Sequence, residues 1–119
     1  MTATSTAVST WVTVCSIDEL LPERGVAALV DGVQLAVFRG FDDVLYAIGN
    51  QDPYTGAFVL SRGIVGSRGS AATVASPLHK QVFDLSTGIC LDDDMLAVPV
   101  YPVRSRAGLV EISLGAAPT

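Results

Sequence analysis

Short apolar runs rich in valine, isoleucine and leucine divide the chain, and glycine, proline, asparagine or aspartate separates them at close intervals. Runs of this kind are typical of β-strands. The predicted strands are residues 11–15, 25–30, 33–38, 44–48, 63–65, 72–75, 82–85, 89–91, 97–103 and 109–114. Strands interrupted this often predict an all-β fold, either an antiparallel sandwich or a small barrel.

Several connections between these strands have recognisable turn signals. Asp31-Gly32 predicts a tight hairpin. The segment from Gly66 to Ser70 predicts a flexible turn, and the segment from Ser105 to Gly108 predicts the turn that pairs the last two strands. Ser16 with Glu19 forms a capping-box pattern for a short helical turn. Residues 57–60 are consistent with either a helical turn or irregular packing.

A length of 119 residues predicts a single domain, which we place at residues 11–114. Residues 1–10 are expected to be a disordered tail, and residues 115–119 a frayed one. The first ten residues contain no basic side chain, so they do not resemble a secretory signal. No apolar run approaches the roughly 20 residues of a membrane span, so no membrane partner is expected.

The charge is unevenly distributed along the chain. The formal net charge of −5 argues against nucleic acid as a partner. Residues 53–83 contain no Asp or Glu but include Arg62, Arg68 and Lys80, so this segment carries +3 and the remainder −8. Such a segregation predicts a docking face that attracts an acidic partner, unless it is a chance feature of a short chain.

The two cysteines, Cys15 and Cys90, lie far apart and show neither a CxxC pattern nor a metal-ligand spacing. We predict two buried free thiols in a reducing cytosol, where they contribute packing.

Two loops and a hairpin carry a family resemblance. The first loop is Asp52-Pro53-Tyr54-Thr55-Gly56, the second is Ser76-Pro77-Leu78-His79-Lys80, and the hairpin is Phe83-Asp84-Leu85-Ser86-Thr87-Gly88. This arrangement resembles a Rieske iron–sulfur domain, with its loops C-P-H-x-G and C-P-x-H-G and its hairpin F-D-L-x-T-G. The resemblance implies a Rieske-like fold in which both loops lie together at one tip.

The positions of the cluster ligands are mostly changed. Asp52 and Ser76 stand where the cysteines would be, Tyr54 replaces one histidine, and His79 remains. A Rieske centre needs two thiolates on one iron and two imidazoles on the other. We therefore expect no cluster, no bound cofactor and no catalytic residue in this chain.

A closer resemblance, spanning 11–114, is to the small subunits of assimilatory NADH-dependent nitrite reductase. It rests on the wording of residues 52–54, 59–65 and 75–78. It implies a cytoplasmic accessory subunit, and a large catalytic partner that holds FAD, an iron–sulfur cluster and siroheme and reduces nitrite to ammonium. The expected docking residues are those of the less acidic two-loop end: Tyr54, Arg62, Arg68 and Lys80.

Other hypotheses remain open. Asp52 and His79 could bind another metal in a small Rieske-related redox carrier, or the chain could be a free-standing ligand-binding module. Asp52, Ser76 and His79 also have the residue types of a hydrolytic triad, but no nucleophile elbow or oxyanion hole is evident. Residues 92–94 share only their charge with a calcium loop.

Overall fold

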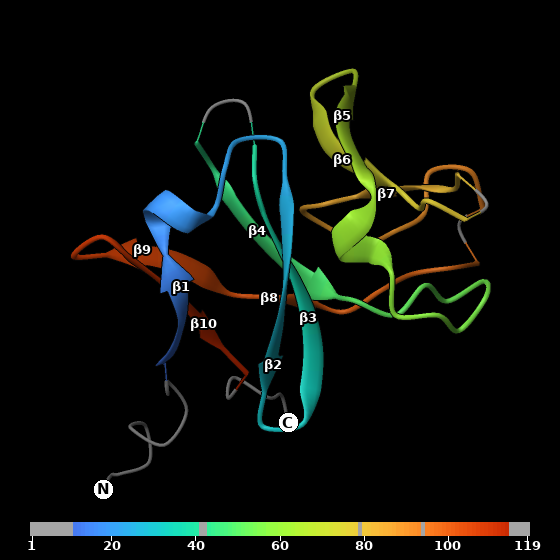
Figure 1. Ribbon diagram of the computed structural model, residues 1–119. Coiled ribbons are helices and arrows are strands. Elements are labelled where there is room, and N and C mark those ends of the chain that lie inside the picture. The colour runs from blue at the N-terminus through green and yellow to red at the C-terminus, as the bar shows by residue number, and fades with distance from the viewer. Residues whose placement is uncertain (1–10, 41–42, 79, 94, 115–119) are drawn as a thin grey trace, which may run out of the picture.

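The computed structural model describes residues 11–40, 43–78, 80–93 and 95–114 (Figure 1). The two tails predicted at residues 1–10 and 115–119 lie outside the described residues. The elements are β1 (Trp11–Ser16), η2 (Ile17–Glu19), β2 (Gly25–Val30), β3 (Val33–Arg39), β4 (Leu45–Gly49), η3 (Leu60–Arg62), β5 (Ile64–Arg68), β6 (Ala71–Ala75), β7 (Val82–Asp84), β8 (Val100–Tyr101), β9 (Val103–Arg106) and β10 (Leu109–Ser113).

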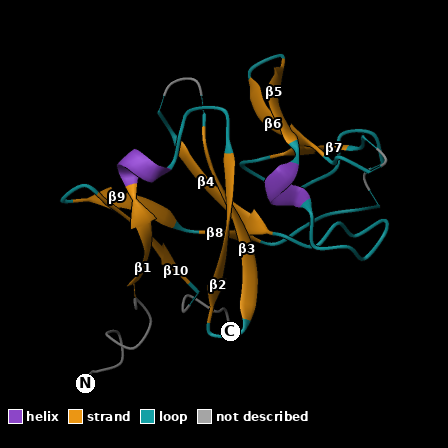
Figure 2. Ribbon diagram, viewed as in Figure 1, coloured by secondary structure: helices purple, strands orange, loops and turns teal. Residues whose placement is uncertain are grey.

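The strands form three antiparallel sheets, so the predicted all-β class is confirmed (Figure 2). The strand orders are β1-β10-β9, β2-β3-β4-β8 and β5-β6-β7. In Figure 1 the first sheet lies on the left, the second in the middle and the third on the right. Among the described residues, no helix is long and apolar enough to cross a membrane.

Strand β3 is buried on both of its faces, because the middle sheet lies between two hydrophobic cores. Side chains alternate across a strand, so successive residues face opposite cores. Ala36 and Phe38 belong to the core shared with the β5-β6-β7 sheet, whereas Leu35 and Val37 belong to the core shared with the β1-β10-β9 sheet. All four side chains have 0% exposure, so β3 is the structural centre of the molecule.

The hairpin predicted at Asp31-Gly32 is confirmed. Val30 pairs with Val33, and both turn residues have positive φ angles, 49° for Asp31 and 81° for Gly32. These angles match the right-handed twist of the paired strands. The predicted helical turn after Ser16 is also present as η2, with the Ser16 N–H donating to Glu19 Oε1 at 2.8 Å.

The turn predicted from Gly66 to Ser70 is shorter than expected. Strands β5 and β6 continue until Arg68 pairs with Ala71, which leaves Gly69-Ser70 as the turn. The ambiguous segment at residues 57–60 ends in the 3₁₀ helix η3, which begins at Leu60.

The prediction of a strand at residues 89–91 was wrong, because Ile89 and Cys90 pair with two different segments of the chain. Ile89 forms a bridge with Ala97, whereas Cys90 forms one with Phe83. Each contact is an isolated bridge that joins one residue to one residue, so neither extends into a ladder.

The single strand predicted at residues 97–103 was also wrong. Pro102 has no N–H to give to a ladder, and it separates β8 from β9. Strand β8 pairs with β4, and only β9 pairs with β10. Residues on the two sides of Pro102 therefore belong to different sheets.

Both cysteines are free thiols, as predicted, but only one of them is fully buried. Cys90 has 1% exposure, whereas Cys15 is half-buried on β1. Burial raises the pKa of the Cys15 thiol above its ordinary value, and the nearby Glu19 carboxylate raises it further. Because the thiolate is the reactive form, both effects reduce the reactivity of Cys15.

We expect Cys15 to react with a thiol reagent more slowly than an exposed model thiol at neutral pH, and Cys90 to react only after unfolding. Replacing Glu19→Gln should lower the pKa of Cys15, because it removes the repelling charge. The pH dependence of the labelling rate, followed by mass spectrometry, measures both effects. Rapid labelling of Cys90 in the folded protein would contradict its burial in the core.

Candidate functional site

The two loops predicted from the sequence close with the same backbone hydrogen bonds. In the first loop (residues 52–57), the Asp52 N–H donates to Ala57 O at 2.7 Å and the Gly56 N–H donates to Asp52 O at 2.7 Å. In the second loop (residues 76–81), the Ser76 N–H donates to Gln81 O at 2.8 Å and the Lys80 N–H to Ser76 O at 3.0 Å. The two loops therefore have equivalent backbone closures.

The fifth residue of each loop has a left-handed backbone. Gly56 has a φ angle of 83°, and Lys80 has a φ angle of 60°. Glycine adopts this conformation readily, whereas a residue with a Cβ atom does so at a cost of about 1–2 kcal/mol. The second loop therefore holds Lys80 in a conformation that the closing hydrogen bonds must stabilise.

The first side chain of each loop caps the same position two residues later. Asp52 Oδ1 accepts from the Tyr54 N–H at 2.8 Å, and Ser76 Oγ accepts from the Leu78 N–H at 3.3 Å. Asp and Ser commonly make such local bonds ahead of a turn, and the proline that follows each of them restricts the backbone further.

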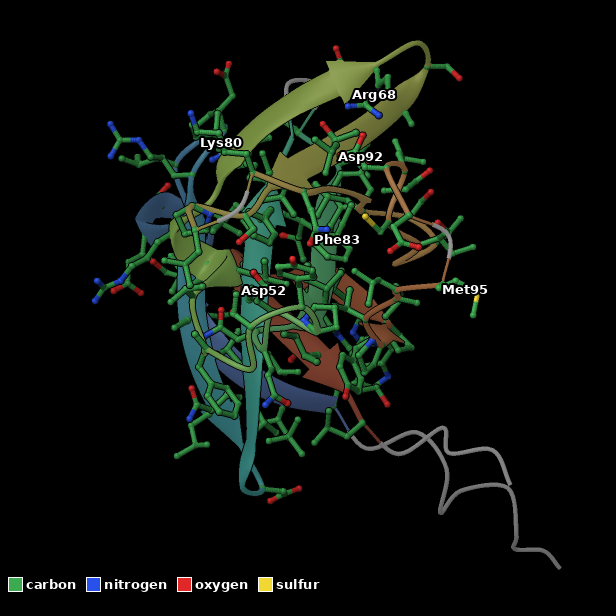
Figure 3. The ribbon with its side chains drawn as sticks, turned by 90° about the vertical axis from the view of Figure 1, so that its right-hand side faces the viewer. Asp52, Arg68, Lys80, Phe83, Asp92 and Met95 are labelled. Carbon is green, nitrogen blue, oxygen red and sulfur yellow. The ribbon has the colours of Figure 1, made fainter. Side chains whose placement is uncertain are left out.

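A buried hydrogen bond joins the two loops. Ser76 Oγ–H donates to Asp52 Oδ2 at 2.6 Å, and the two residues are 1% and 0% exposed (Figure 3 labels Asp52). A buried carboxylate is costly unless hydrogen bonds satisfy it, and here both carboxylate oxygens have a donor. The structure thus brings together Asp52 and Ser76, two of the predicted site residues, and His79 lies outside the described residues.

These side chains do not fit a [2Fe–2S] cluster. A carboxylate and a hydroxyl, bonded to each other, occupy the positions that thiolates would need. The two cysteines lie outside both loops, at Cys15 on β1 and at Cys90. Within the described ranges, no three His, Cys, Asp or Glu side chains gather as a metal site.

The hydrogen bond also bears on the triad hypothesis. In a hydrolytic triad the serine hydroxyl donates to an imidazole, which in turn donates to the carboxylate. Here the Ser76 hydroxyl donates directly to the Asp52 carboxylate, so it is held in a structural contact rather than activated by a base.

Three apolar side chains lie exposed at the loops, and we call them the tip patch: Tyr54, Phe58 and Leu78. Their exposed fractions are 56%, 50% and 50%. The sequence reasoning identified Tyr54 but missed Phe58 and Leu78. The available signal was that both are apolar residues within or just beyond the two loops, where a core position is not expected.

The three predicted basic residues lie in different settings. Lys80 is exposed in the second loop, and Arg62 is exposed at the end of η3. Among the described residues, neither takes part in a salt bridge. Arg68, by contrast, pairs with Asp92 at 3.1 Å (Figure 3).

Asp92 connects this ion pair to the strand that follows the second loop. Its Oδ2 accepts from the Val82 N–H at 2.9 Å, and its Oδ1 accepts from Arg68. The hydrogen bond from Val82, followed by that from Arg68, lowers the pKa of Asp92 below its ordinary value. Asp92 and Arg68 therefore brace the segment after Cys90 against the β5-β6-β7 sheet.

The chain matches the Rieske-like [2Fe-2S] domain family over residues 10–113. It is 44% identical over 105 residues to the nitrite reductase (NADH) small subunit of Salmonella typhimurium, covering 87% of this chain and 97% of that protein. The solution structure of the Escherichia coli protein NirD superposes with a TM-score of 0.82 at 42% identity, covering 90% of this chain and 98% of that one.

A further relative carries this domain inside a longer chain. The nitrite reductase [NAD(P)H] large subunit of Klebsiella oxytoca is 38% identical over 100 residues, which cover 84% of this chain but only 10% of that protein.

We predict that the Asp52–Ser76 hydrogen bond is a strong contributor to the stability of the two loops. Either Asp52→Ala or Ser76→Ala should lower the free energy of unfolding by about 1–3 kcal/mol, because each leaves a buried polar partner unsatisfied. The double variant should lose less than the sum, with a coupling of about 1 kcal/mol or more. Urea denaturation of the four proteins measures these values.

The exposed Asp84–Ser86 pair provides a matched control. Ser86 Oγ donates to Asp84 Oδ1 at 2.7 Å, but on the surface rather than in the interior. Its double-mutant cycle, with Asp84→Ala and Ser86→Ala, should show a smaller coupling, since water replaces the lost partner. Equal couplings for the two pairs would rule out a special role for the buried one.

Proposed function

The chain belongs to the Rieske-like [2Fe-2S] domain family and, within it, to the small subunits of NADH-dependent nitrite reductase, and we propose that it is the accessory subunit of such an enzyme. In this role it binds and stabilises, or modulates, a large catalytic subunit that reduces nitrite to ammonium in the cytoplasm. The observation that carries the proposal is the preformed two-loop tip, whose apolar side chains are exposed above a buried Asp52–Ser76 hydrogen bond.

The Klebsiella oxytoca relative supports a shared assembly. There, the matching region is part of the large chain itself. A domain fused to its partner has an effective concentration of about the millimolar range, so a weak interface is sufficient. A small subunit that is a separate protein, such as the Salmonella typhimurium relative, has no such linkage, and its interface must provide the affinity. We therefore assign the exposed tip patch to that interface.

The redox chemistry belongs to the large partner in this proposal. Its FAD, iron–sulfur cluster and siroheme would transfer electrons from NADH to nitrite, and this chain would contribute no cofactor and no catalytic residue. The donor set at the loops supports this division, because a carboxylate and a hydroxyl cannot replace two thiolates. The alternative of a metal carrier gains no support from Asp52, since both of its carboxylate oxygens already accept hydrogen bonds.

Docking at the tip combines an apolar centre with basic surroundings. Tyr54 is the aromatic anchor, and aromatic residues are frequent at the energetic centres of interfaces. Lys80 and Arg62 would accelerate the encounter with an acidic patch on the large subunit. The hydrogen bond between Asp52 and Ser76 fixes the two loops before binding, which reduces the entropy lost on association.

We expect the purified protein to be colourless and to fold without metal, because apolar burial of the strands rather than coordination stabilises it. Visible absorption spectra, with iron and acid-labile sulfide assays, check this expectation, and circular dichroism in the presence of a chelator follows the fold. Stoichiometric iron, or unfolding by the chelator, would contradict it.

We also predict that Tyr54→Ala weakens binding to the cofactor-loaded large subunit by roughly 2 kcal/mol or more, as expected for an interface anchor. Lys80→Glu should slow association, and the effect should decrease as salt is added. Titration calorimetry and stopped-flow measurements of the two subunits provide these values.

Two variants on other surfaces serve as controls. Leu29→Ala removes an exposed apolar side chain from β2, and Arg106→Glu reverses an exposed charge on β9. Both should bind normally. If wild-type protein does not bind the large subunit, the accessory role is wrong; if Tyr54→Ala and Lys80→Glu bind like the controls, docking occurs elsewhere on the chain.

A further inference from the structure

A second exposed apolar surface lies on the segment that follows β7. Residues 88–91 run antiparallel to residues 95–98. The Val98 N–H donates to Gly88 O at 2.8 Å, the Cys90 N–H donates to Leu96 O at 3.0 Å, and Ile89 forms a bridge with Ala97. This short hairpin is distinct from the two loops of the tip.

The two faces of this hairpin differ in exposure rather than in polarity. Cys90 and Val98 point into the core and have 1% and 6% exposure. The alternate residues face outwards, although they are also apolar, and we call them the hairpin patch: Ile89 (44% exposed), Leu91 (38%), Met95 (87%) and Ala97, which is exposed. Several exposed apolar side chains on one short hairpin make it a candidate interaction site.

The charge around the hairpin patch is opposite to that around the tip. Residues 81–103 contain four aspartates and no lysine or arginine. Asp92 is balanced by Arg68, but Asp93 is exposed beside Met95, and its Oδ1 accepts from the Met95 N–H at 3.0 Å. Arg62 and Lys80 near the tip have no such acidic neighbour in sequence, because residues 53–83 contain no Asp or Glu.

The hairpin is anchored next to both loops of the tip. The Gly49 N–H, which lies shortly before the first loop, donates to Pro99 O at 3.0 Å. Asp92 accepts from the N–H of Val82, which comes directly after the second loop. In Figure 1 the loops and the hairpin occupy the same half of the molecule. Figure 3 faces that half and shows Met95 at its edge, across the view from Lys80.

We propose that the hairpin patch is a second contact area for the large subunit, and that it binds an apolar surface bordered by basic side chains. The inference rests on the proposed accessory function and adds the chemistry of the partner surface. With a basic tip and an acidic hairpin, the combined face is bipolar. A partner with acidic groups opposite Lys80 and basic groups opposite Asp93 can bind in one orientation, whereas the reversed orientation brings like charges together.

A second copy of this chain is the competing occupant. Because the basic tip and the acidic hairpin share one face, a two-fold axis could pair the tip of each copy with the hairpin of the other and close a dimer. We favour the large subunit because the hairpin is bonded next to the loops that carry the tip patch, which we assign to that interface. Sedimentation of the isolated chain distinguishes the two occupants.

Two substitutions in the hairpin test the proposal on the complete two-subunit complex. Met95→Glu places a charge at the most exposed large side chain of the patch and should raise the Kd for the cofactor-loaded large subunit at least about tenfold. Asp93→Asn keeps the oxygen that caps the Met95 N–H but removes the charge. It should raise the Kd a few fold at low salt and have little effect at high salt.

Matched controls separate a local effect from a general one. Leu29→Glu introduces the same charge at a 70% exposed apolar position on β2, and Asp18→Asn removes an exposed carboxylate at η2. Both should bind like wild-type protein. Urea denaturation confirms that all four variants remain folded.

Three outcomes would overturn the proposal. If Met95→Glu binds as tightly as Leu29→Glu while Tyr54→Ala binds weakly, the hairpin is not a contact area but the accessory function stands. If wild-type protein does not bind the large subunit, both proposals fail together. If the isolated chain self-associates and Met95→Glu abolishes this association, the occupant is a second copy.

Discussion

The burial of β3 on both faces is the constraint on which the positions of the two loops depend. The middle sheet and the β5-β6-β7 sheet share one hydrophobic core. The middle sheet contributes Ile48 to it, and the β5-β6-β7 sheet contributes Val74. Strand β4 ends at Gly49, shortly before the first loop, and β6 ends directly before the second. Packing between these two sheets therefore sets the distance between the loops, and places the Ser76 hydroxyl within 2.6 Å of the Asp52 carboxylate.

A hydrogen bond between side chains joins the loops at the positions where the related iron–sulfur domains have thiolate ligands. Metal coordination can supply much of the folding energy of a small domain, whereas one buried hydrogen bond contributes only about 1–3 kcal/mol. The stability of this chain must therefore come from its two hydrophobic cores, which bury Phe38 and Phe83 completely. The hydrogen bond orders the tip rather than holding the whole fold together.

Local signals predicted the features that depend on neighbouring residues. The β-branched runs identified most strands, Asp31-Gly32 identified its hairpin, and Ser16 with Glu19 identified the helical turn. Features that depend on distant partners were missed. Ile89 and Cys90 form single bridges to two different segments, at Ala97 and at Phe83, and no local pattern reveals these partners. The place of Phe58 and Leu78 at the loops was a signal of exposure, but the structure is needed to show that no distant segment covers their apolar side chains.

The two exposed apolar surfaces are best understood together with the charges that surround them. An apolar contact is not directional, so on its own it would permit several ways of docking. Charged residues of opposite sign on either side give one arrangement an electrostatic advantage over the others. Lys80 adopts a left-handed backbone that closes the second loop, and Asp93 caps the backbone N–H of Met95. These two residues thus shape the second loop and the hairpin and give the face its polarity, which links the local backbone geometry to the orientation of the partner.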